Sequence, residues 1–113
     1  MGKSQRTKGR RGERKAELML LDRDYCELMR NPAGKDGHDI TAKCPRTGKF
    51  LAVEVKNHVI WNWTNFMTQA RTNAKKYGYL WAVLFHIPNS RAWLFWRQDE
   101  VPTIWFEKGS DDE

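Results

Sequence analysis

The sequence has no long apolar run, few cysteines and no internal repeat. None of its apolar stretches reaches the roughly 18 residues that a membrane-spanning helix needs, so we expect no membrane segment and no membrane partner. No apolar segment follows the basic start, so we expect no secretory signal and a cytoplasmic protein, in the host cytoplasm if it is viral. Cys26 and Cys44 lack the spacing of a metal site and are expected to be free thiols.

The positive charge of the sequence is concentrated at its start. The segment from Met1 to Lys15 carries seven basic side chains and one acid, and its net charge of +6 equals that of the whole chain. Such a segment usually meets a polyanion, most commonly nucleic acid, although it can also be a solvated tail. The side chains predicted to contact nucleic acid from this segment are Lys3, Arg6, Lys8, Arg10, Arg11 and Arg14.

The length of 113 residues is enough for one domain and hardly more. Residues 1–9 are polar and rich in lysine, arginine and glycine, so we expect them to form a basic flexible arm. The ending GSDDE, residues 109–113, is expected to be a loose acidic tail. The folded domain should therefore cover residues 10–108.

Two helices and several strands are expected within this domain. The segment beginning at Gly12 is rich in strong helix formers and has Leu18 and Leu21 on one side, while residues 25–30 fit either more helix or a short strand. A second helix is expected over 64–77. The other predicted strands are 38–43, 49–56, 79–86, 91–96 and, last and short, 103–107. This order indicates an α/β domain with a mixed sheet flanked by helices.

Charged residues interrupt the otherwise apolar strand FLAVEVK. Glu54 and Lys56 are two positions apart, so both side chains point to the same face of the sheet. If this strand pairs with the preceding one, Asp39 lies near the same face, and two close carboxylates raise each other's pKa. A divalent cation removes that conflict, so Asp39, Glu54 and the Val55 carbonyl are predicted ligands of Mg²⁺, with Mn²⁺ as its substitute.

Lys56 would stand beside this ion, able to orient a water or to neutralise a phosphate. The set suits metal-assisted hydrolysis of a phosphodiester. The alternative is an exposed ion pair of Glu54 and Lys56, which contributes about 0–1 kcal/mol and has no catalytic role.

Five segments follow one another along the chain: KGRRGERKAEL, LMRNPAG, HDITAK, LAVEVKN and TQARTNAKKYG. In order and spacing they resemble the PD-(D/E)XK nuclease superfamily and, more closely, the archaeal-type Holliday junction resolvases, over about residues 8–97. The resemblance implies a restriction-endonuclease-like fold, in the order αβββαββ, in which residues 25–30 form a strand.

The resemblance also implies roles for individual residues. It implies that Asp39 and Glu54 are metal ligands and that Lys56 is the catalytic lysine. It implies Glu13 as a further acid of the metal and catalytic site, with Glu17, one turn later, as its competitor. It implies Gln69, on the second helix, as another residue of the catalytic site.

The loop before HDITAK departs from the family pattern. His38 stands where the family usually has proline, and we expect it to be a polar edge residue. Asp36 competes with Asp39 for the role of ligand, but its glycine-flanked position is typical of a turn. The loop has no serine or threonine, so Asn31 or Lys35 is expected to contact phosphate instead.

Further contacts with nucleic acid are predicted outside the basic start. Arg30 ends the motif LMR. Trp61 and Trp63 could stack on a splayed base, or cover the sheet edge and brace the second helix. Arg71 and Lys75 give that helix a basic side, which either touches phosphates or is solvated.

The leading hypothesis is a Mg²⁺-dependent endonuclease that resolves four-way DNA junctions by symmetric paired cuts. A four-way junction is nearly two-fold symmetric and one chain offers one site, so we expect a homodimer, with the apolar strands after Gly78 as its contact. One alternative is a nuclease of the same fold that acts on other DNA in repair, replication or restriction. Another is a non-catalytic nucleic-acid-binding module in which the acids serve only structure.

Overall fold

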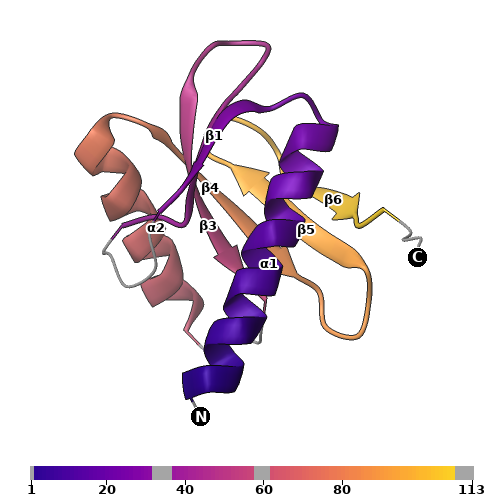
Figure 1. Cartoon of the computed structure of the whole chain (residues 1–113). Coiled ribbons are helices and arrows are strands. Elements are labelled where there is room, and N and C mark those ends of the chain that lie inside the picture. The colour runs from indigo at the N-terminus through magenta and orange to yellow at the C-terminus, as the bar shows by residue number, and fades with distance from the viewer. Residues whose placement is uncertain (1, 32–36, 58–61, 109–113) are drawn as a thin grey trace.

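One mixed sheet organises the chain. The computed structural model describes residues 2–31, 37–57 and 62–108. Within these residues the helices are α1 (Gly2–Asp22) and α2 (Trp63–Tyr77), and the six strands are β1 (Cys26–Arg30), β2 (Ile40–Lys43), β3 (Phe50–Lys56), β4 (Leu80–His86), β5 (Ala92–Arg97) and β6 (Thr103–Phe106) (Figure 1). The predicted α/β fold is confirmed, and β1 resolves the ambiguity over residues 25–30. No helix of this described part is long and apolar enough to cross a membrane.

The strands lie in the sheet in the order in which they occur in the sequence. Neighbouring strands are antiparallel except β3 and β4, which are parallel because α2 carries the chain back between them. The register places Ile40 of β2 opposite Val53, and Val83 of β4 opposite Glu54. The strand that carries Glu54 and Lys56 is therefore central, with a neighbour on each side.

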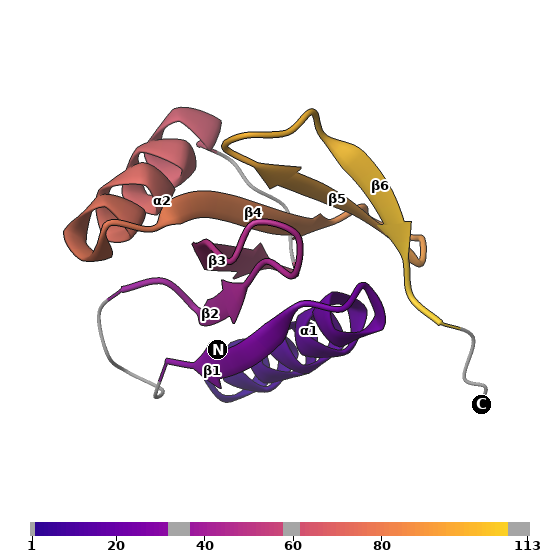
Figure 2. The same cartoon turned by 90° about the horizontal axis from the view of Figure 1, so that it is seen from above.

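The two helices cover opposite faces of the sheet (Figure 2). The alternation of β3 decides which side chains meet which helix: Leu51, Val53 and Val55 are buried in the cluster that includes residues of α1. On the other face, α2 buries Phe66 and Ala70 against the central strands. Glu54 therefore lies on the α2 side of the sheet, together with the other even-numbered residues of β3.

The helix α1 begins at Gly2, within the segment expected to be a basic arm. The expected flexible arm, residues 1–9, is helical from Gly2 onward because lysine, arginine and glutamine favour helix and no proline interrupts the segment. Leu18 and Leu21 do not face the core: they are 53% and 54% exposed, whereas the buried side is formed by Ala16, Met19 and Leu20. The expected tail, 109–113, lies outside the described residues.

A glycine sets how closely α1 approaches the end of β3. Gly12 is buried, and a Cβ added there would lie 2.7 Å from the Cβ of Asn57, which directly follows β3. Only a residue without a side chain fits this approach. The close approach brings the next residue, Glu13, toward the same end of the sheet as Glu54 and Lys56.

Candidate active site

Asp39 and Glu54 meet because β2 pairs with β3. Asp39 immediately precedes β2, and its Oδ2 accepts a hydrogen bond of 2.8 Å from the Val55 N–H. Glu54 is only 8% exposed, so it is buried beneath α2 and is not an outward-facing surface residue. The structure thus brings together the two carboxylates and the backbone of Val55, as the strand pairing predicted.

Burial perturbs both carboxylates in the same direction. Desolvation raises the pKa of Glu54 from 4.5 to about 7, and the nearby charge of Asp39 adds to the effect, while Asn73 and Lys56 oppose it. Burial also raises the pKa of Asp39, against the opposing effects of the Val55 N–H and the Lys56 charge. A bound cation would relieve the raised pKa values of this pair, of which Glu54 is buried and Asp39 part-buried.

Glu13 is the third carboxylate of the site. Burial, followed by the charge of Asp39, raises its pKa, while Arg30 lowers it. The Arg30 guanidinium lies 3.3 Å from the Glu13 carboxylate and 3.5 Å from that of Glu17. Both candidate acids on α1 thus pair with Arg30, and the charge of Asp39 acts on Glu13.

Lys56 completes the charged group at the end of β3. It is half-buried, and its Nζ lies 5.7 Å from the centre of the Phe66 ring on α2. Its positive charge lowers the pKa of both Asp39 and Glu54. The predicted lysine is thus close enough to act electrostatically on both carboxylates.

Asn73 is a site residue that the sequence motifs did not indicate. Its Nδ2 donates a hydrogen bond of 2.9 Å to Glu54 Oε2, and the residue is 7% exposed. Gln69, which the family resemblance implied for this helix, lies one turn earlier and is exposed. The sequence feature that could have indicated Asn73 is its position: it is a polar residue within the apolar stripe of α2, one helical turn after Gln69.

The donor set fits a cation that keeps part of its water shell. Among the described residues, no three histidine, cysteine or acidic side chains gather closely enough to hold a metal ion by themselves. The carboxylates of Asp39 and Glu54, together with a backbone carbonyl, leave positions for water and phosphate oxygens. Magnesium-type sites commonly have this composition.

The other predicted contacts with nucleic acid are more dispersed. Arg11 and Arg14 are exposed on α1, and Arg71 and Lys75 are exposed on α2. Trp63 is 40% exposed, and its ring packs edge-to-face against Phe66 and Phe85. Four more of the predicted positions, Lys3, Arg6, Lys8 and Arg10, lie in the first half of α1. Lys35 and Trp61 lie outside the described residues, and so does Asp36.

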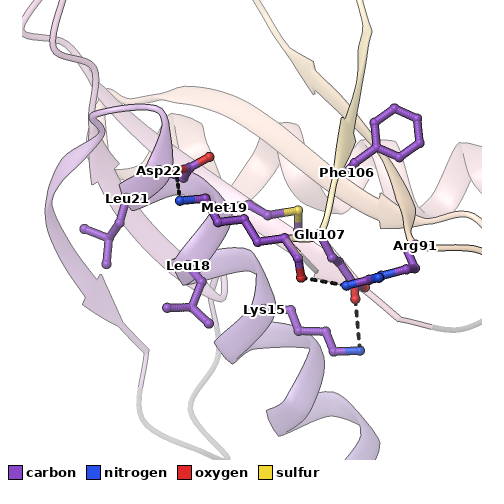
Figure 3. Close-up of a pocket in the computed structure, with 9 residues that line it drawn as sticks. Lys15, Leu18, Met19, Leu21, Asp22, Arg91, Phe106 and Glu107 are labelled. Carbon is purple, nitrogen blue, oxygen red and sulfur yellow. Dashed lines mark hydrogen bonds and ion pairs between the residues drawn. The ribbon is translucent and has the colours of Figure 1, made fainter. Parts of the chain in front are cut away.

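A separate cavity of about 750 Å³ lies between α1 and the end of β6 (Figure 3). Leu18, Leu21 and Phe106 contribute apolar side chains to it. Four of its charged side chains form two ion pairs: Lys15 lies 3.4 Å from Glu107, and Asp22 lies 2.6 Å from Lys108. Arg91 donates a hydrogen bond of 2.7 Å to the Lys108 carbonyl. Within the described residues the cavity includes none of the clustered carboxylates, so its size alone does not mark the reactive centre.

The comparisons with known proteins agree with this arrangement. The structure is similar to that of Hjc from Archaeoglobus fulgidus, a Holliday junction resolvase from an archaeal hyperthermophile, with a TM-score of 0.58, 25% sequence identity, and coverage of 86% of this chain and 87% of that chain. No protein-family model and no curated protein matches the chain. The resemblance indicated by the motifs is therefore confirmed in three dimensions: the chain has the α/β fold of an archaeal-type Holliday junction resolvase.

Proposed function

We propose that the protein is a Mg²⁺-dependent endonuclease that cuts four-way DNA junctions. The observation that carries the proposal is the pair of a buried Glu54 and a part-buried Asp39, with Lys56 acting on both, at the end of a central strand. The similarity to a Holliday junction resolvase of the same fold supports a nuclease, and the basic side chains near the start of the chain support a polyanionic substrate.

The residues of the site have distinct roles in this proposal. Asp39, Glu54 and the Val55 carbonyl would hold Mg²⁺, for which Mn²⁺ would substitute; when bound, the ion supplies positive charge that acidifies water and stabilises the phosphorane-like transition state. The Val55 N–H holds Asp39 in place, and Asn73 holds Glu54. Lys56 orients the attacking water or neutralises charge on the phosphate, and Arg30 positions Glu13.

An apolar face of the sheet supports a homodimer. The helix α2 lies over β3 and β4 and leaves β5 and β6 uncovered on its face of the sheet (Figure 2), where the register places Leu94 of β5 opposite Ile104 of β6. Ile104 is 47% exposed, and Leu94 is part-buried. A two-fold dimer formed through this face would provide two sites for the two strands of a nearly symmetric junction.

The test is cleavage of a labelled four-way junction and of a linear duplex of matched sequence, each with Mg²⁺ or with chelator. We expect paired cuts in the junction, only with Mg²⁺, and loss of cleavage with retained binding in Asp39→Asn and Glu54→Gln. Asp24→Asn is the matched control, because Asp24 is an exposed acid with a φ of 68° that asparagine tolerates.

Each alternative has its own outcome in this experiment. Equal cutting of the linear duplex would contradict a junction-selective enzyme and favour a nuclease that acts on other DNA. Binding without cleavage under every metal condition would favour a non-catalytic binding module. Undiminished cleavage by Asp39→Asn would contradict the assigned site.

A further inference from the structure

A second pocket adjoins the clustered carboxylates on the α2 side of the sheet. It has a volume of about 510 Å³ and is formed by β1, β2, the start of β3 and the C-terminal end of α2. Arg30 lines this pocket and also pairs with Glu13, at 3.3 Å. His38, another lining residue, directly precedes Asp39. The pocket and the proposed catalytic site therefore share one boundary.

Aromatic rings form one wall of this pocket. The rings of Tyr77 and Tyr79 stack with their centres 5.6 Å apart, and the ring of Phe50 lies 5.5 Å from that of Tyr79. Gly78, between the two tyrosines, has a φ of 71° and reverses the chain at the end of α2, which places both rings on the same side. Tyr77 remains 55% exposed, so part of its ring is available to a ligand.

His38 contributes a buried polar atom with no partner. The residue is 7% exposed, so it is not the polar edge residue that the sequence indicated. Its Nε2 lies 2.6 Å from Thr41 Oγ1, but its buried Nδ1 has no hydrogen-bond partner in the described part of the chain. A buried polar atom of this kind is costly unless a ligand or water satisfies it.

Two cationic side chains lie beside these rings, and each is paired with acids. Arg30 lines the pocket and pairs with Glu13 and Glu17. The Nζ of Lys43 lies 5.8 Å from the centre of the Phe50 ring and 3.2 Å from Glu27, another lining residue. Cationic side chains next to exposed aromatic rings are the combination that binds a single-stranded nucleotide, because the rings stack on the base and the cations meet the phosphate. The volume of the pocket also falls within the range of small-molecule sites.

We propose that this pocket binds one unpaired nucleobase of the DNA substrate, next to the phosphate that is cut. The base stacks on the Tyr77–Tyr79 pair, and its polar edge bonds to His38 Nδ1. This proposal rests on the proposed nuclease function. In a continuous duplex both faces of a base are covered by its neighbours, whereas at a branch point a base can leave the stack. The pocket thus favours branched DNA over linear duplex.

The test measures binding with chelator present, so that no cleavage occurs. Dissociation constants are compared for an intact four-way junction and for a series of junctions with one abasic residue at successive positions around the branch. We expect one position at which loss of the base weakens binding by about tenfold. Tyr77→Ala should weaken binding of the intact junction to the same extent and remove the difference between the two DNAs.

Conservative and matched variants separate stacking from a general loss of structure. Tyr77→Phe keeps the ring and should behave as the wild type, as should Thr72→Ala, which alters another exposed residue of α2. His38→Leu should remove any dependence of affinity on which of the four bases occupies the position. If it does not fold, Tyr77→Ala still decides the outcome.

Different results would contradict the pocket proposal and the proposed nuclease function. The pocket proposal is overturned if no abasic position weakens binding by the wild type, or if Tyr77→Ala retains the full difference between intact and abasic junctions. Junction cleavage can persist in either case, and the nuclease would then stand without a base pocket. Conversely, a base-dependent affinity in a protein that cuts no DNA would support the pocket and contradict the nuclease.

Discussion

Glu54 is the residue whose environment departs most from that of an ordinary surface acid. Its pKa rises from 4.5 to about 7, chiefly by burial, so the folded protein holds the proton more tightly than the unfolded chain does. The stabilisation is complete below pH 4.5 and is lost as pH rises through about 7. In metal-free protein we expect this residue to lower the free energy of unfolding by on the order of 2–3 kcal/mol across that interval.

Urea denaturation of wild type and Glu54→Gln between pH 4 and 8, with chelator, checks this expectation. The difference between the two proteins isolates Glu54 from the other groups that titrate. Glu54→Gln should lose part of the decline, and Mg²⁺ should stabilise the wild type more at pH 8 than at pH 5, because only the ionised carboxylate binds it well. Parallel pH profiles for the two proteins would contradict the burial-raised pKa.

Asn73 and Gln69 provide a second prediction at this scale. Asn73 donates to Glu54 at 2.9 Å, whereas Gln69 is exposed. We expect Asn73→Ala to reduce the cleavage rate about 10–100-fold and to raise the Mg²⁺ concentration needed for half-maximal rate, as is usual when the partner of a metal ligand is removed. Gln69→Ala, the matched change one turn earlier, should retain activity. A larger loss of cleavage rate in Gln69→Ala than in Asn73→Ala would show that Gln69, and not Asn73, acts in the site.

The difference between these two residues shows where the sequence was informative. The approach of Asp39 to Glu54 follows from the two-residue period of a strand and the pairing of neighbouring strands, both of which the sequence carries. The role of Asn73 depends on how α2 rotates about its axis over the sheet. That rotation is set by packing of Phe66 and Ala70 against the strands, which no local pattern specifies.

Among the elements, α1 differed most from expectation and β3 least. The helix is continuous from Gly2 because most residues of this basic segment favour helix. A disordered arm can have the same composition, so the composition alone did not distinguish the two. Leu18 and Leu21 are exposed because Ala16 and Leu20, on the other side of α1, are the residues packed against the sheet. In β3, Leu51, Val53 and Val55 alternate along the strand, and only one pairing with the neighbouring strands buries all three on one face.

The close approach of α1 to β3 gives a prediction at Gly12. A Cβ there would lie 2.7 Å from that of Asn57, so Gly12→Ala should push α1 away from the sheet and displace Glu13. We expect a loss of about 1–3 kcal/mol in the free energy of unfolding, typical of overpacking, together with slower cleavage. Leu18→Ala, on the exposed side of α1, should change stability by less than about 0.5 kcal/mol. Unchanged stability in Gly12→Ala would contradict the approach.

At the scale of the whole molecule, the uncovered apolar face of β5 and β6 predicts the oligomeric state. Ile104, on the edge strand β6, is 47% exposed, so a charge there should oppose burial of the face against a second copy. We expect Ile104→Glu to convert a dimer to a monomer in sedimentation experiments and to replace paired junction cuts with single nicks, because each monomer keeps one site. Val101→Glu, at a position 77% exposed outside β6, is the control and should remain dimeric. A monomeric wild type that still makes paired cuts would show that the two strands are cut without a dimer.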